Sequence, residues 1–172
     1  LRVYHICHAA GEFAYMSKTL VFMGLISMAI AAIFMIGQRD LKRMLAYSSI
    51  EHMGIVTLGL GIGAPALFGT LFHIITNGLT KGVLFLSVGN IHRAFGSKNV
   101  DRVQGAIRLL PFSGTLFLIA FLAITGSPPF APFVSIFAIL NGAFEAKKYI
   151  TAGLFLMFLL LVFIGMGAPI LK

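Results

Sequence analysis

Long apolar runs alternate with short polar breaks along the whole chain. In sequence order the runs cover approximately residues 19–37, 44–63, 65–91, 110–125, 133–144 and 149–171. Several of them are about 17 to 25 residues long, enough for a helix to cross a hydrocarbon layer of roughly 30 Å. The pattern predicts an all-α fold: a polytopic transmembrane helical bundle of about five to six segments, forming one domain over residues 1–172.

The first 18 residues have a different character. They mix apolar and polar side chains, so we expect the end of an earlier helix followed by a loop. The chain begins at Leu1 and lacks the order of regions that defines a signal peptide. We therefore interpret the sequence as an internal fragment of a longer protein.

Residues 126–132 (GSPPFAP) interrupt the apolar pattern with three prolines and a glycine. Proline lacks a backbone N–H and clashes with the preceding turn, so no regular helix continues through this segment. The shorter apolar pieces fit either separate crossings or one discontinuous helix. We expect a discontinuous helix near residues 126–132, an arrangement that often marks an ion site in transporters.

Basic residues are concentrated at the ends of the apolar runs. The net charge of +8 is compatible with a nucleic-acid partner, but the basic residues form no patch with exposed aromatic residues, so nucleic-acid binding is not expected. Residues 38–43 and 92–108 hold seven of the 13 Lys and Arg residues, whereas the loops near Gly63 and Ser127 hold no charged residue. The positive-inside rule then predicts that the basic side faces the cytoplasm.

The composition limits the chemistry of the chain. Hydrophobic residues make up 59% and charged residues 10%, which is typical of a membrane protein. The single cysteine, Cys7, excludes a multi-cysteine metal or iron–sulfur site. The sequence has no phosphate-binding glycine motif, zinc-ligand spacing or nucleophile with a base. We expect no cofactor and no intrinsic redox chemistry, so any enzyme activity would belong to a complex that contains the chain.

Three polar residues lie on one stripe inside the third apolar run. His73, Asn77 and Lys81 recur at steps of four, which places them along about 12 Å of one helix face. A charged lysine at this depth costs at least about 2.5 kcal/mol on insertion scales, so Lys81 indicates a proton-carrying function. His73 is a second titratable group. The alternative is that these side chains only hold helices together, which is the simpler interpretation for Asn77.

Residues 48–54 (SSIEHMG) place Glu51 and His52 near the middle of the second run. Adjacent helical residues point about 100° apart, so the two side chains face different neighbours. A buried carboxylate needs a cationic or hydrogen-bonding partner, and both a proton relay and a structural ion pair fit. Lys42 and Arg43 precede this run, and the pattern alone makes them ordinary flanking charges.

Three segments resemble a known family. QRDLKRMLAYSSIEHMGI (38–55), FHIITNGLTKGVLFLSVGNI (72–91) and ITGSPPFAPFVSIF (124–137) are similar to the proton-translocating, antiporter-like membrane subunits of respiratory complex I, energy-converting hydrogenases and Mrp cation/proton antiporters. The details IEHMG and VGNI most resemble the hydrogenase-4 component F branch. The resemblance implies that the chain is a central to C-terminal portion of a larger subunit.

The resemblance also implies roles for single residues. It equates Lys81 with the family's central lysine, His73 with the histidine two turns before it, and Lys42 with the lysine that links neighbouring units. Two positions depart from the family. Asn77 stands where a second histidine is common, and Ile136 stands where an ionisable Lys or Glu is common. Neither side chain carries a proton, which puts the exit side of the pathway in question.

The expected function is proton translocation by a subunit of a membrane-bound oxidoreductase complex of the hydrogenase-4 or NADH:quinone type. The alternatives are an Mrp-type Na+/H+ antiporter subunit and a structural membrane anchor that has lost transport. Expected partners are other membrane subunits, a peripheral redox arm, the lipid bilayer, and protons or Na+, in the plasma membrane of a prokaryote. The candidate pathway residues are Lys81, His73, Lys42, Glu51, His52 and Asn77.

Overall fold

The structure is a computed structural model that describes residues 6, 9, 11–103 and 105–170. Its helices are, in order, α2 (Phe13–Met35), α3 (Leu41–Ile62), α4 (Ala64–Phe95), η1 (Val100–Arg102), α5 (Ala106–Leu109), α6 (Pro111–Ile124), α7 (Ala131–Glu145) and α8 (Tyr149–Ile170). Within these residues no strand forms beyond an isolated antiparallel bridge between Asp40 and Asn99. The predicted all-α fold is confirmed.

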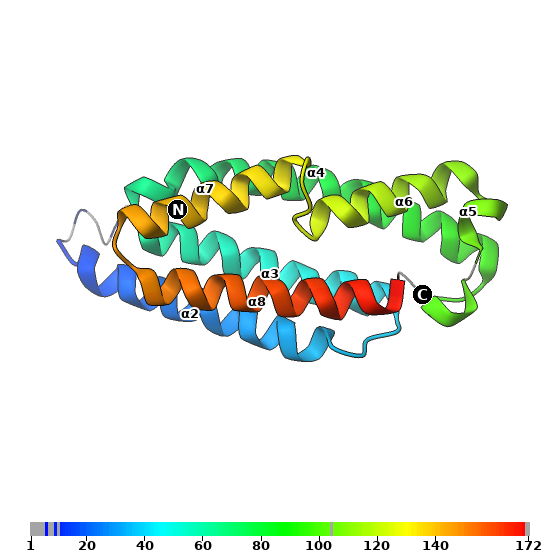
Figure 1. Ribbon diagram of the computed structural model, residues 1–172, viewed down its shortest axis with the longest axis horizontal. Helices are drawn as coiled ribbons and strands as arrows, with labels where there is room; N and C mark the ends of the chain where they lie inside the picture. Colours follow the sequence, from blue (N-terminus) through cyan, green and yellow to red (C-terminus); the bar gives the residue numbers. More distant parts are fainter. Residues whose placement is uncertain (1–5, 7–8, 10, 104, 171–172) are drawn as a thin grey trace.

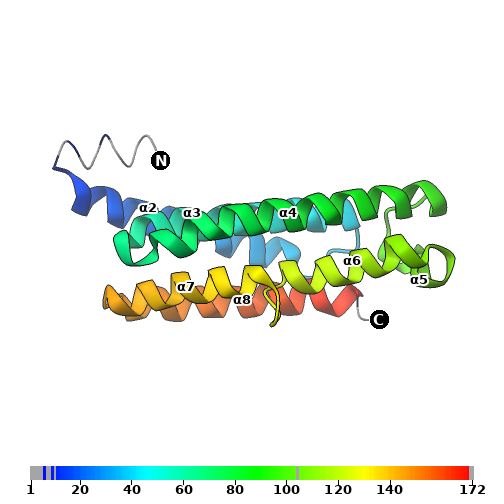
Figure 2. The same cartoon turned by 90° about the horizontal axis from the view of Figure 1, so that it is seen from above.

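The long helices run side by side in one elongated bundle (Figure 1). α3 and α4 are consecutive and turn sharply at Gly63, whose φ of 100° is a left-handed conformation that favours glycine. α6 and α7 lie end to end, and together they follow the length of α4 in both views (Figures 1 and 2). The two short helices therefore complete one pass through the bundle between them.

The segment between α6 and α7 interrupts that pass. α6 ends at Ile124, Gly126 has a left-handed φ of 73°, and α7 begins at Ala131. Pro128 and Pro129 lie within the interruption, joined by a cis peptide bond, and Pro132 lies in the first turn of α7. The discontinuous helix expected near residues 126–132 is confirmed.

The start of α3 is set by a capping residue. The Asp40 carboxylate accepts hydrogen bonds from the backbone N–H groups of Lys42 (2.8 Å) and Arg43 (3.1 Å). These bonds satisfy donors that a helix N-terminus otherwise leaves unpaired. The helix therefore begins at Leu41, and both basic residues lie in its first turn instead of in the polar break.

Two other helix boundaries differ from the prediction. α2 begins at Phe13, so the loop expected over residues 1–18 is wrong for residues 13–18, which contain neither Gly nor Pro. Much of the remaining expectation, including the tail of an earlier helix, lies outside the described residues. α4 continues to Phe95 and ends at Gly96, whose left-handed φ of 63° is typical of a helix C-terminus.

Glycines bring neighbouring helices into backbone contact. A Cβ built on Gly24 of α2 would lie 2.8 Å from the carbonyl oxygen of Gly54 in α3, and the reverse contact would measure 2.9 Å. Such small-residue contacts are typical of packed membrane helices. Buried apolar side chains such as Leu84, Phe121 and Met166 fill the space elsewhere.

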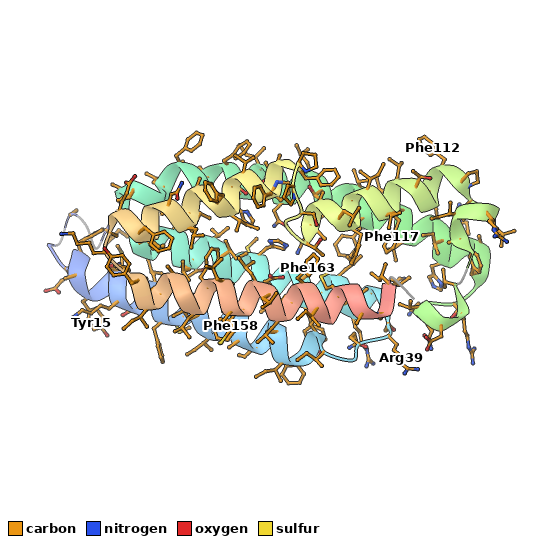
Figure 3. All side chains as sticks on the ribbon, in the orientation of Figure 1. Tyr15, Arg39, Phe112, Phe117, Phe158 and Phe163 are labelled. Atoms are coloured by element: carbon orange, nitrogen blue, oxygen red, sulfur yellow. The ribbon has the colours of Figure 1, made fainter. Side chains whose placement is uncertain are left out.

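Large apolar side chains cover the outside of the bundle, as Figure 3 shows for the outward-pointing Phe112. Phe22 and Ile75 are also mostly exposed. By length and composition, α2, α4 and α8 are each able to cross a membrane. α3 is as long as α8 but carries charged residues. An apolar exterior over a partly polar interior confirms the predicted polytopic transmembrane bundle.

The basic connections meet at one end of the bundle. Arg39 forms an ion pair with Asp101 at 3.0 Å, and the backbone N–H of Leu41 donates to the Lys98 carbonyl at 3.0 Å. These contacts show that the two basic connections predicted to share a side, residues 38–43 and 92–108, lie together.

The opposite end differs from the sequence expectation. The segment near Ser127 is not a loop at that end, because it is the interruption inside the α6–α7 pass (Figure 1). The connection there is residues 146–148, which include Lys147 and Lys148. The expectation of two uncharged opposite loops is therefore wrong. The larger basic group remains at the first end: Arg39, Lys42, Arg43, Arg93, Lys98, Arg102 and Arg108.

Candidate functional site

The polar stripe of α4 faces the interior of the bundle. His73 is fully buried, Asn77 is 3% exposed, and Lys81 is half-buried. Because α3 and α4 are antiparallel neighbours, residues that follow one another on α4 meet residues in reverse order on α3. Within the second predicted pair, which is also buried, His52 contacts His73 of the stripe, and Glu51 interacts electrostatically with Lys81.

A row of hydrogen bonds joins three helices at the centre of the site. His52 Nδ1 of α3 lies 3.0 Å from His73 Nε2 of α4, and His73 Nδ1 lies 2.8 Å from Ser135 Oγ of α7. Ser135 Oγ in turn donates to the Pro132 carbonyl at 2.8 Å. The row ends in the first turn of α7, beside the interruption of the broken helix.

The single hydroxyl hydrogen of Ser135 fixes the direction of the row. Since that hydrogen is donated to Pro132, Ser135 Oγ must accept from His73 Nδ1. His73 Nε2 is then unprotonated and accepts from His52 Nδ1, an assignment that follows from the hydrogen-bond network. In the neutral row every N–H points toward the interruption. His52 Nε2 makes no hydrogen bond that meets the distance criterion among the described residues, and in this assignment it is the nitrogen that can accept a proton. The backbone of Ile124, at the end of α6, is a further polar group that acts on the His52 ring.

Lys81 lies about two turns after His73 on α4. Its Nζ donates to Ser49 Oγ of α3 at 2.7 Å. Its charge also acts on Glu51, although no ion pair within 4.0 Å joins the two in the described part of the chain. The sequence left open a structural ion pair or a relay for Glu51. The separation favours an electrostatic neighbour over a tight structural pair.

The register between α4 and α7 is what brings Ser135 to His73. Gly142 packs on Ala66, where an added Cβ would lie 2.7 Å from backbone atoms, and Gly69 packs on Ile139 at 2.8 Å. Each of these contacts lies about one turn from the next on both helices, and the His73–Ser135 bond continues the same series. Small residues at these positions thus set the donor–acceptor distance in the row.

The remaining candidates fall in different places. Lys42 is exposed in the first turn of α3 and contacts none of the row. Asn77 lies between His73 and Lys81, and its Oδ1 has no hydrogen-bond partner among the described residues. Ile136 is a buried apolar residue beside Ser135.

Sequence reasoning missed two members of the site. Ser49 and Ser135 were not among the candidate pathway residues, because an isolated serine in an apolar run usually bonds to its own helix. The available signals were their positions: Ser49 is two residues before Glu51, and Ser135 follows the proline-rich interruption.

The fold and the site define a class of protein: a polytopic helical membrane protein with a buried titratable row that ends at a broken helix. The sequence also decides the family. The chain belongs to the transmembrane family described as NADH:quinone oxidoreductase/Mrp antiporter, which matches residues 2–164.

Individual relatives agree with this assignment. The chain is 38% identical over 134 residues to a hydrogenase-4 component F homolog of Methylacidiphilum infernorum, covering 77% of the chain and 28% of the relative. It is 34% identical over 149 residues to NADH-quinone oxidoreductase subunit N of Desulforudis audaxviator, covering 86% and 30%. Among solved structures, a chain of respiratory complex I from Thermus thermophilus aligns with a TM-score of 0.83 at 29% identity, covering 92% and 34%.

The chain thus spans about a third of the length of these relatives. The resemblance drawn from the three sequence segments is confirmed at the level of the family.

Proposed function

We propose that the chain forms part of a proton-translocating membrane subunit of an oxidoreductase complex, of the hydrogenase-4 or NADH:quinone type. The observation that carries the proposal is the His52–His73–Ser135 row, which starts at a nitrogen able to accept a proton and ends at the broken helix. The names of the two relatives support an oxidoreductase complex.

The row has the chemistry that proton transfer requires. Each imidazole has one nitrogen that donates and one that accepts, so a proton taken up at one nitrogen releases another from the opposite nitrogen. A proton added at His52 Nε2 would move the His52 Nδ1 proton to His73, and the His73 Nδ1 proton toward Ser135. Each hop crosses an existing hydrogen bond of 3.0 Å or less.

Lys81 supplies the charge that controls the row. Coulomb interactions inside a protein are several times stronger than in water, because the surroundings polarise less. A proton on Lys81 opposes a proton on His52 or His73 and favours the carboxylate form of Glu51. Loss of the Lys81 proton would therefore allow His52 or His73 to take up a proton, which couples Lys81 to the histidine row.

The rest of the assembly follows from this role. Redox chemistry belongs to partner subunits in a peripheral arm. Lys42, which is exposed at the basic end of the bundle, would link the site to a neighbouring unit. The basic end would face the cytoplasm, and the location would be the plasma membrane of a prokaryote.

The test is substitution of Lys81 by Met in the full-length subunit within its complex. We expect Lys81→Met to abolish proton uptake into vesicles driven by the natural electron donor, while assembly is unchanged. Lys98→Met, at an exposed lysine of the basic end, is the matched control and should pump normally. Wild-type uptake by the Lys81→Met complex would refute the proposal. Uptake that requires Na+ would instead support the second candidate named by the family, a cation/proton antiporter.

A further inference from the structure

A lysine outside the polar site binds three parts of the bundle together. Lys148 lies in the connection between α7 and α8, at the end opposite the basic connections. Its Nζ donates to Ser17 Oγ of α2 at 2.9 Å and to the Gly61 carbonyl of α3 at 3.0 Å. Ser17 is buried and also donates to the Gly61 carbonyl. The proposed proton pathway uses none of these groups.

The Gly61 carbonyl explains why a cation is placed there. Gly61 lies in the last turn of α3, where carbonyl groups have no partner within the helix and carry partial negative charge. The last turn of α3 contains no basic residue of its own. Lys148 forms no ion pair within 4.0 Å with any described acidic residue, so the helix terminus is its electrostatic partner.

The connection that carries Lys148 is rigidly joined to α7. The Lys148 backbone N–H donates to the Ala143 carbonyl at 3.0 Å, and its carbonyl accepts from Ala152 at the start of α8. Gly142, in the last turns of α7, packs on Ala66 just after the α3–α4 turn. The lysine and the glycine thus hold α7 at the same corner of the bundle.

We infer that Lys148 is a positioning residue: it fastens the α7–α8 connection to the C-terminal turn of α3 and thereby sets the place of α7, with Ser135, against His73. This inference rests on the proposed function only for the effect on proton transfer between His73 and Ser135. α3 carries His52 and α7 carries Ser135, so one clasp fixes both outer members of the row relative to each other.

Four substitutions separate the parts of the clasp in the full-length complex. Lys148→Arg keeps the charge and the donors, Lys148→Gln keeps donors only, and Lys148→Met removes both. Ser17→Ala removes one acceptor. Lys18→Met is the matched control, because Lys18 is the exposed neighbour of Ser17 on α2.

The first measurement is amide hydrogen exchange over residues 142–152 in the purified complex. We expect Lys148→Met to speed exchange about tenfold, the factor that corresponds to loss of one charge-assisted hydrogen bond. Lys148→Gln should fall between Lys148→Met and wild type, and Lys148→Arg should restore slow exchange. Unchanged exchange in Lys148→Met would overturn the inference.

The second measurement is proton uptake by the same variants. We expect uptake to fall in Lys148→Met and to recover in Lys148→Arg. Faster exchange with wild-type uptake would show that the clasp closes the corner without positioning the row, which also overturns the inference. Failure of the proposed function is distinguishable, because it would leave uptake intact in Lys81→Met, whereas the exchange result does not depend on pumping.

Discussion

Replacing Gly142 by Ala should damage proton transfer without touching any titratable group. The added Cβ would lie 2.7 Å from the Cα and N atoms of Ala66, whereas ordinary contact begins at 3.4 Å. These are backbone atoms and cannot rotate away, so α7 must move by about 0.7 Å at this point. Ser135 lies two turns away on the same face of α7. The same displacement would lengthen its 2.8 Å bond to His73 to about 3.5 Å, the limit for a hydrogen bond.

The energetic cost is modest but the functional cost is large. Overpacking costs about 1 to 3 kcal/mol, and Ala offsets part of it because it is roughly 0.5 to 1 kcal/mol better than Gly within a helix. The complex should therefore assemble with a slightly lower melting temperature while proton uptake falls strongly. Gly78→Ala is the control, since nothing lies within 4 Å of its Cβ position. Wild-type uptake by the Gly142→Ala complex would show that the His73–Ser135 bond does not carry the proton.

Two further predictions concern the ends of the bundle. Burial lowers the pKa of Lys148 below its ordinary 10.5, because the cost of desolvating the charged amine exceeds the attraction of the α3 terminus. The folded protein therefore binds this proton less tightly than the unfolded chain, and raising the pH from the lowered pKa toward 10.5 should stabilise wild type relative to Lys148→Gln. Thermal unfolding across that pH range checks the sign, and a wild-type advantage that shrinks with rising pH would contradict it. Cysteine introduced at Ser97 should react with an impermeant reagent only from the cytoplasmic side, because the basic residues concentrate at that end; ready labelling from outside in right-side-out vesicles would reverse the topology.

The approximate positions of the long helices could be predicted because the sequence signals for them are local. Apolar length alone locates the long helices, and the prolines and glycine of residues 126–132 locate the interruption. The starts of α2 and α3 were misplaced for a local reason as well. Asp40 caps α3 through backbone contacts that a hydropathy pattern does not contain.

The polar stripe was predictable for the same reason, since steps of four on one helix place side chains on one face. The contacts that join the stripe to other helices could not be predicted in this way. Ser135 meets His73 because Gly142 and Gly69 set the register of α7 against α4. That register is a property of two surfaces in contact, and nothing in the spacing of either segment specifies it.

The departures from the family acquire a physical meaning at the end of the row. Where the family commonly has an ionisable side chain, Ile136 is buried and reaches the Gly126 position, where an added Cβ would meet it at 3.1 Å. An isoleucine cannot take a proton from the row, so the group next to His73 that can do so is the hydroxyl of Ser135. That hydroxyl donates its hydrogen to the Pro132 carbonyl, and to pass a proton onward the hydroxyl has to turn away from this acceptor. On the proposed function, the side chains of α3 and α4 load the proton, and its release depends on a serine held at the edge of the broken helix.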